Sequence, residues 1–190
     1  MLDLKIIEAA QVIKQGGIII APAEGIYGFS CAFDDEKALD RIIKVKERDP
    51  HKGLIVISDT LIRALPLMDQ KRIPPVCMMQ MQDLWPGHNT FVVPAAPEIS
   101  ELLTGGMRTI AVRVTAFEVL RNLVEQVGKP IISTSANISG QKSTSDIAPL
   151  IECFKDKVDY ILDLPCQGLK GSSAIYDGIT GDILRARGGA

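Results

Sequence analysis

The sequence predicts an α/β (α+β) domain built on a twisted, mixed parallel and antiparallel sheet flanked by helices. Helix-like and strand-like segments alternate through the first part of the chain, and short β-rich runs separated by Gly-rich turns dominate the last part. Helical crossovers join parallel strands, whereas successive hairpins join antiparallel ones. With 190 residues, 46% of them hydrophobic, the chain can build one substantial core, so we expect a single domain over residues 1–190.

The N-terminal elements follow from apolar spacing and from residues that begin or end helices. Asp3 can cap a first helix, which Gly16 ends, and Asp34 or Asp35 can cap a second helix, which cannot pass Pro50. The predicted elements are a helix over 3–15, strands at 17–21 and 28–33, a helix over 38–45, a strand at 54–57 and a short helix at 60–65.

The remaining elements are predicted in the same way, and the clearest helix signal lies after residue 114. Thr115 and Glu118 have the spacing of a capping box, and Gly128 can end the helix that follows. The predicted elements are a helix over 75–84, an extended segment at 89–94, a strand at 109–114, a helix over 119–127, and strands at 130–133, 159–164, 173–176 and 182–185.

Composition excludes several classes of protein. The formal net charge of −2 gives no overall reason to expect nucleic acid, so any site for a polyanion must be local. The four cysteines lack C-x-x-C spacing and indicate reduced thiols in a cytoplasmic protein. No apolar run approaches the ~20 residues of a membrane-spanning helix, so we expect no membrane association.

A first candidate site is the basic segment Lys46-Glu47-Arg48, followed by Lys52. The Asp49-Pro50 pair moves the chain out of helical geometry, which allows these cations to gather and neutralise phosphates. The alternative is that cations at a helix C-terminus only complement the helix dipole, which contributes about 0.3–1 kcal/mol. The segment alone does not decide between these interpretations.

A second candidate is the polar loop that begins at Ser133 and follows the β-rich pair Ile131-Ile132. Alternation places Ser133, Ser135 and Asn137 on one side, where hydroxyls and an amide can bind polar ligand atoms. The alternative is a loop that satisfies its own backbone. The density of polar residues directly after a strand favours a ligand site.

Arginines in apolar or C-terminal strands add to the candidates. Arg113 lies inside the apolar run 110–114, so its guanidinium needs an anionic partner, either a carboxylate or a ligand phosphate. Arg185 presents the same two alternatives. His51 and His88 are isolated and are interpreted as surface or turn residues.

Missing motifs narrow the chemistry further. The chain has neither a G-x-x-x-x-G-K-[ST] loop nor a G-x-G-x-x-G motif after a strand, so a nucleotide would not bind in a standard phosphate loop. No spacing indicates a protein metal site, and no nucleophile elbow or Cys/His pair indicates covalent catalysis.

Several segments, in order along nearly the whole chain, resemble the YrdC/TsaC family in its short, single-domain form. The specific combination is Lys46-x-Arg48 with the run Ser133-Thr134-Ser135-Ala136-Asn137. The other segments are 21–28, 52–54, 84–87, 111–114 and 180–185. The resemblance implies a YrdC-like fold with a concave binding cavity.

The resemblance also implies an activity. Members are nucleotidyltransferases that make L-threonylcarbamoyladenylate and pyrophosphate from L-threonine, bicarbonate or CO₂, and ATP, the first step of the t6A modification of tRNA. A separate t6A transferase complex then receives the product. Mg²⁺ would be held through the ATP phosphates, which agrees with the absence of a carboxylate cluster.

The resemblance assigns roles by residue. Lys46 and Arg48 would be catalytic by holding phosphates. Nucleotide-binding residues would be Ser133, Ser135, Asn137, Arg113 and Arg185, and substrate-binding residues would be Ala23, Lys52 and Arg113.

Two departures from the family pattern concern recognition of threonine and the shape of a turn. The family usually has Pro-Thr-Glu where this chain has Pro22-Ala23-Glu24, and one lost hydrogen bond of about 0.5–1.5 kcal/mol would weaken recognition of threonine without abolishing it. After Trp85-Pro86-Gly87 this chain has His88-Asn89, where the family usually has a proline and an apolar residue.

Two other functions stay open at this point. One is an RNA-binding module, for tRNA or double-stranded RNA, whose affinity would fall steeply with salt. The other is a diverged nucleotide-binding paralogue with another substrate. The acidic composition disfavours the first, and the presence of both K-x-R and S-T-S-A-N disfavours the second.

Overall fold

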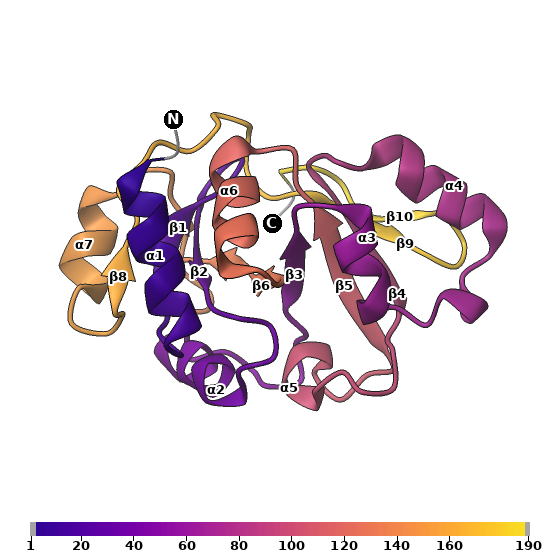
Figure 1. Cartoon of the computed structure of the whole chain (residues 1–190), viewed down its shortest axis with the longest axis horizontal. Helices are drawn as coiled ribbons and strands as arrows, with labels where there is room; N and C mark the ends of the chain where they lie inside the picture. The colour runs from indigo at the N-terminus through magenta and orange to yellow at the C-terminus, as the bar shows by residue number, and fades with distance from the viewer. Residues whose placement is uncertain (1–2, 189–190) are drawn as a thin grey trace.

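The computed structural model describes residues 3–188, and two β-sheets with helices packed around them make up the fold (Figure 1). The helices are α1 (Leu4–Lys14), α2 (Glu36–Val45), α3 (Leu61–Ala64), α4 (Pro75–Leu84), α5 (Glu101–Thr104), α6 (Glu118–Val127) and α7 (Ala148–Phe154), with 3-10 turns η1 (Leu65–Leu67) and η2 (Gln70–Arg72). The strands are β1 (Ile19–Pro22), β2 (Tyr27–Ser30), β3 (Ile55–Ser58), β4 (Asn89–Pro94), β5 (Thr109–Val114), β6 (Ile131–Ile132), β7 (Thr134–Ser135), β8 (Tyr160–Ile161), β9 (Ala174–Asp177) and β10 (Ile183–Arg185).

The mixed pairing expected from the sequence is confirmed, but the strands form two sheets. The smaller sheet has the order β7-β2-β1-β8 and the larger has the order β10-β9-β4-β5-β3-β6. The pairs β1–β8, β3–β5 and β4–β9 are parallel, and the others are antiparallel. An isolated bridge between Ala32 and Ile131 connects the chain after β2 to β6, so the two sheets meet along this line.

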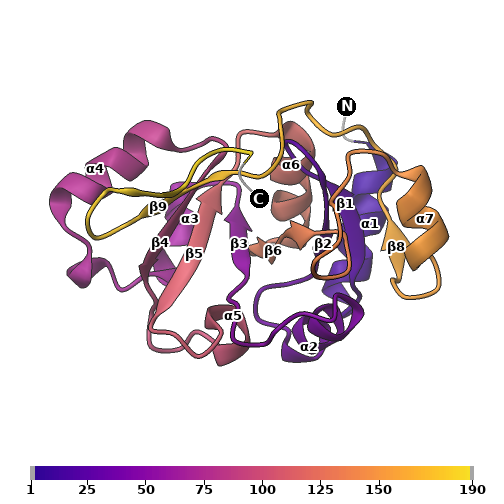
Figure 2. The same cartoon turned by 180° about the vertical axis from the view of Figure 1, so that it is seen from behind.

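The chain crosses between the sheets once more near its C-terminal end. After β8 it leaves the smaller sheet and runs to β9 in the larger one (Figure 2). On the way, the backbone N–H of Gln167 donates to the carbonyl of Ala23 and that of Leu169 donates to the carbonyl of Glu24. A Cβ on Gly25 would lie 2.1 Å from the carbonyl oxygen of Gly171, so only glycine lets this segment pass over the β1–β2 turn.

Helices α1 and α6 lie side by side, both against β1 of the smaller sheet, and α6 also contacts β3 of the larger one (Figure 1). Their apolar faces, including Ile6, Ile13 and Leu120, form one core cluster with Ile19 and Ile57. A second cluster packs the apolar faces of α2 and α4 against the sheets and includes Phe29 in β2 and Phe91 in β4. Burial of these faces fixes the helices and holds the two sheets together.

The caps predicted from the sequence agree with the structure in two of three cases. The side chain of Asp3 accepts from Lys5 N at the start of α1, and that of Asp35 accepts from Ala38 N at the start of α2. The capping box is wrong: α6 starts at Glu118 after Phe117, and no side chain caps it. Thr115 instead uses its hydroxyl in a buried hydrogen bond to Glu24.

Other differences from the predicted elements are local. Helices α5 and α7 and the short strand β7 were not predicted, and β6 and β8 are shorter than expected. Among residues 3–188, no helix has both the length and the apolar composition needed to cross a membrane.

Candidate functional site

A cavity opens where the two sheets meet, and cationic and hydroxyl side chains dominate its polar lining. Arg48, Arg113 and Arg185 reach it from three separate parts of the chain, and Ser133 and Ser135 reach it from the segment that follows β6 and includes β7. The cavity measures about 170 Å³, below the ~300–1,000 Å³ of pockets that bury a drug-sized ligand. A nucleotide bound here would therefore extend through the open mouth.

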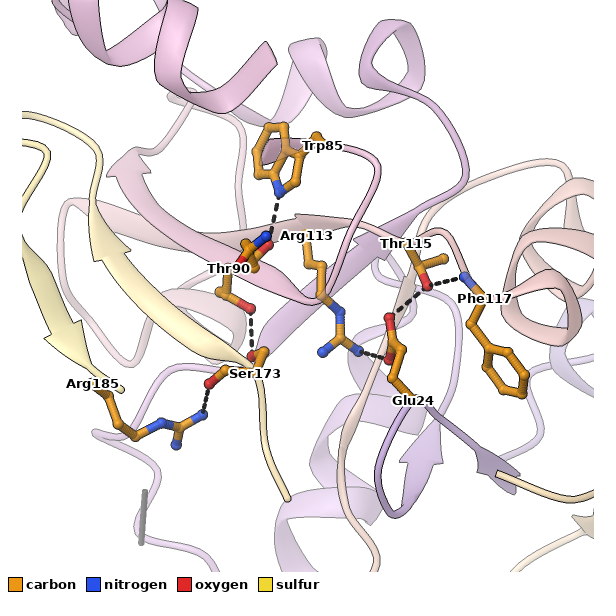
Figure 3. Close-up of polar contacts among 9 residues, drawn as sticks. Glu24, Trp85, Thr90, Arg113, Thr115, Phe117, Ser173 and Arg185 are labelled. Carbon is orange, nitrogen blue, oxygen red and sulfur yellow. Dashed lines mark hydrogen bonds and ion pairs between the residues drawn. The ribbon is translucent and has the colours of Figure 1, made fainter. Parts of the chain in front are cut away.

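A buried ion pair joins the two sheets on one side of this cavity. Arg113 in β5 points toward Glu24, which follows β1, and its Nη2 lies 3.1 Å from Glu24 Oε2 (Figure 3). Thr115 Oγ1 donates to Glu24 Oε1 at 2.7 Å and accepts from the backbone N–H of Phe117 at 3.1 Å. Because the side chains of Arg113 and Glu24 are only 6% and 2% exposed, neither charge has water as an alternative partner.

The second guanidinium, that of Arg185, is held by the strand next to it. Its Nη2 donates to the carbonyl of Ser173 at 3.0 Å, and Ser173 Oγ lies 2.8 Å from Thr90 Oγ1 in β4 (Figure 3). None of the ion pairs found within residues 3–188 includes Arg185. Within residues 3–188 its hydrogen-bond partner is thus a neutral carbonyl and not a carboxylate.

Arg48 also has neutral partners. Its Nε donates to the carbonyl of Lys52 at 3.2 Å and its Nη2 donates to the carbonyl of Gly53 at 2.7 Å. In the described part of the chain no ion pair involves Arg48. These two bonds fix the direction of the guanidinium at the cavity wall, and Asp49 opposes its charge only through space.

Lys46 is buried, and it faces the polar loop. Its Nζ donates to the carbonyl of Ser135, to the carbonyl of Asn137 at 2.9 Å and to Asn137 Oδ1 at 3.0 Å. Its own carbonyl accepts from the backbone N–H of Ser139 at 2.8 Å. An ammonium has three N–H groups, so these contacts use all of them, and Lys46 anchors the loop that carries Ser133 and Ser135.

The backbone conformation of Glu47 lets Lys46 and Arg48, on either side of it, point in different directions. It has φ of 50°, a left-handed conformation that a residue with a Cβ adopts at a cost of about 1–2 kcal/mol. This conformation turns the chain after α2, so that Lys46 enters the interior and Arg48 reaches the cavity wall. The K-x-R spacing therefore works through a strained residue in the middle.

We expect Glu47→Gly to leave the unfolding free energy unchanged or to raise it by up to about 1 kcal/mol, because glycine adopts positive φ without strain. The same change at Glu125, exposed in α6, should lower it by about 1 kcal/mol. Urea denaturation of both variants measures the difference. If Glu47→Gly destabilised as much as Glu125→Gly, strain at residue 47 would be absent.

Burial lowers the pKa values of these cations. Desolvation lowers the pKa of Lys46 to about 8, and the charge of Arg48 adds to the effect. Desolvation also lowers the pKa values of Arg48, Arg113 and Arg185, with Glu24 opposing the shift at Arg113. Several desolvated cations around one cavity indicate an anionic ligand, because a bound anion would recover part of the lost solvation.

The structure brings most of the predicted site residues to one place. Those that line the cavity are Ala23, Arg48, Arg113, Ser133, Ser135 and Arg185. Lys46 and Asn137 lie behind the wall, where they hold the loop. Lys52 is exposed and does not line the cavity, although its carbonyl orients Arg48.

Sequence reasoning missed several residues of this site, His88 and Ser173 among them. His88 was interpreted as a surface or turn residue; it does lie in a turn, but its side chain is buried and lines the cavity. Ser173 closes the side next to Arg185. An isolated histidine or serine carries no spacing signal, so only the fold could place them.

The cavity offers little to a metal ion. No carboxylate is among its lining residues within the described part of the chain. Over residues 3–188, no three His, Cys, Asp or Glu side chains come together as a candidate metal site. The nearby Glu24 is already engaged with Arg113 and Thr115.

Comparison with known proteins identifies the family. The Sua5/YciO/YrdC family, described as "Telomere recombination", matches residues 11–188. The chain belongs to this family. A relative named threonylcarbamoyl-AMP synthase, from Pseudoalteromonas translucida, is 37% identical over 186 residues, which cover 97% of this chain and 100% of the relative.

Solved structures of the Sua5/YciO/YrdC family share the fold. The crystal structure of P. abyssi Sua5 complexed with L-threonine has a TM-score of 0.87 and 32% identity, and covers 93% of this chain. This chain spans 52% of that Sua5 protein, about half its length. E. coli YciO, at 23% identity over 97% of this chain and 90% of its own, has a TM-score of 0.84 and agrees in fold.

Proposed function

We propose that this protein is an L-threonylcarbamoyladenylate synthase, which uses L-threonine, bicarbonate or CO₂, and ATP and releases pyrophosphate. The name of the P. translucida relative and the L-threonine complex of Sua5 support this proposal. The observation that carries it is the cavity itself, where three desolvated arginines surround a space large enough for a small polar substrate and open to a longer one.

The residues suit nucleotidyl transfer without a protein nucleophile. An oxygen of the N-carbamate of threonine attacks the α-phosphorus of ATP, the bond to the bridging oxygen breaks, and pyrophosphate leaves with the electron pair. Catalysis then consists of positioning the reactants and stabilising negative charge. Neither Arg48 nor Arg185 forms an ion pair within residues 3–188, so we assign them to the phosphates.

The remaining residues are assigned by their place at the cavity. Ser133 and Ser135 contact the nucleotide from the loop, and Lys46 with Asn137 keeps that loop in position. Arg113 is held by Glu24 on one side and presents its free nitrogens to the substrate on the other. Mg²⁺ enters bound to the ATP phosphates, since the cavity supplies no carboxylate for it.

We place the product upstream of the t6A modification of tRNA, as the donor for a separate transferase complex. The acyl adenylate is a mixed anhydride, so it must pass to an acceptor before water hydrolyses it. Weak tRNA binding stays a proposal; if it occurs, its affinity should fall with added salt.

The test is direct detection of the adenylate. Purified protein with ATP, Mg²⁺, bicarbonate and L-threonine should yield a product with the mass of threonylcarbamoyl-AMP and one pyrophosphate per product. Omitting any one substrate should remove both. A panel with serine, valine and alanine in place of threonine tests the effect of Ala23. Formation of no adenylate with any amino acid would contradict the proposal.

A further inference from the structure

His88 is buried beside the cavity, and its Nδ1 makes no hydrogen bond. The residue follows the Trp85-Pro86-Gly87 turn and is 6% exposed. Within the described residues, Nδ1 is a buried polar atom without a partner, although its side chain lines the cavity. Leaving such an atom unpaired costs about 1–3 kcal/mol, which a bound ligand would recover.

Two further unpaired atoms belong to neighbouring cavity residues. The Nε atoms of Arg113 and Arg185 are also buried without partners in the part of the chain that the structure describes. A guanidinium nitrogen can only donate, and imidazole Nδ1 can donate in one tautomer. In the tautomer with the proton on Nδ1 all three atoms can donate, and an oxygen anion would supply the acceptor.

The charges around His88 favour the same ligand. Burial is the largest cause that lowers the pKa of His88 to about 4. The charges of Arg113, Arg187 and Arg185 lower it further, and that of Glu24 raises it. At neutral pH the ring is thus neutral, and the charge that faces it is mainly cationic. An anion placed among these groups meets donors on several sides.

The residue after His88 fixes the turn that presents it. Asn89 Nδ2 donates to the carbonyl of Leu84 at 3.2 Å, and the carbonyl of Asn89 accepts from Trp85 Nε1 at 2.7 Å. The backbone N–H of Gly87 donates to the carbonyl of Val114 at 2.8 Å. The imidazole is therefore held in a closed turn next to β5.

We propose that His88 is a substrate-contacting residue, whose Nδ1 hydrogen-bonds an anionic oxygen of the bound substrate beside Arg113 and Arg185. The oxygen belongs either to the carboxylate or carbamate of the amino acid or to a phosphate of the nucleotide. This inference rests on the proposed function for the identity of the ligands. The positions of the three unpaired atoms do not depend on that function.

The test uses the fact that the chain has two histidines. Exposed His51 serves as an internal reference, and His51→Gln assigns the two imidazole signals in NMR spectra. The pKa of His88 in the free protein should be near 4. An anion bound at hydrogen-bond distance favours the imidazolium, so its pKa should rise by about 1–3.

Two separate titrations identify the source of the anion. A rise with L-threonine alone supports the carboxylate, a rise that also needs bicarbonate supports the carbamate, and a rise only with a non-hydrolysable ATP analogue supports a phosphate. If these ligands bind, as calorimetry shows, and the pKa of His88 moves with none of them, the proposal is overturned. This result is independent of product formation, so a protein that makes the adenylate without moving His88 would contradict only the present inference.

Kinetics of variants give a second measurement. His88→Leu should raise the KM for the ligand identified by NMR about 10- to 100-fold, the effect of losing one hydrogen bond to a charged group. His88→Asn, which keeps a side-chain donor, should recover part of the loss, and His51→Gln should match the unmodified protein. Unchanged KM values for both L-threonine and ATP in His88→Leu would overturn the assignment.

Discussion

Glu24→Ala is expected to lower the unfolding free energy by about 3–5 kcal/mol and to remove adenylate synthesis. The change leaves the guanidinium of Arg113 buried without its counter-charge, and breaking a buried ion pair by removing one partner carries a cost of this size. It also leaves Thr115 Oγ1 without its acceptor. Urea denaturation and the adenylate assay measure the two losses.

Two companion variants separate stability from activity. Glu125→Ala makes the same chemical change at an exposed position of α6 and should alter stability by less than about 0.5 kcal/mol. Combining Glu24→Ala with Arg113→Met removes both charges, which should restore much of the stability but none of the activity. A Glu24→Ala protein as stable as the original would show that the ion pair does not hold the two sheets together.

Arg48→Ala is expected to lower kcat/KM about 10²- to 10³-fold while the melting temperature changes little. The side chain donates only to two backbone carbonyls, those of Lys52 and Gly53, so the fold loses little without it. Its positive charge at the cavity wall is what a transferring phosphoryl group requires, and removal of one such donor has an effect of this size.

Arg72→Ala is the matched control for Arg48, because Arg72 is exposed and lies in η2. Its activity should equal that of the unmodified protein. Steady-state kinetics with ATP varied at saturating L-threonine and bicarbonate measure both variants. Normal turnover by Arg48→Ala would remove this residue from the phosphate site.

Much of the fold was predictable because local signals and tertiary packing agree. The spacing of Ile6 to Ile13 behind Asp3, and the run that Gly128 ends, gave two helices with nearly correct ends. The capping box failed because the hydroxyl of Thr115 forms a buried bond with Glu24, a partner 91 residues away. A single domain over the whole chain stays a prediction, supported by the parallel pairing of β1 with β8.

The site was predictable in its parts but not in its geometry. Arg113 needed an anionic partner, and the structure supplies the carboxylate of Glu24, whereas contact with a ligand phosphate stays a prediction. Lys46 could not be placed, because no sequence signal predicts a left-handed conformation at Glu47. His88 gave no pattern at all, and only the turn before β4 brings it inside.

The central claim is that one cavity between the two sheets binds both substrates. A crystal structure with a non-hydrolysable ATP analogue and L-threonine tests it most directly. We predict the triphosphate beside Arg48 and Arg185, with the amino acid near Arg113. Nucleotide bound elsewhere, for example in the groove between α1 and α2 lined by Lys37 and Lys129, would contradict the account.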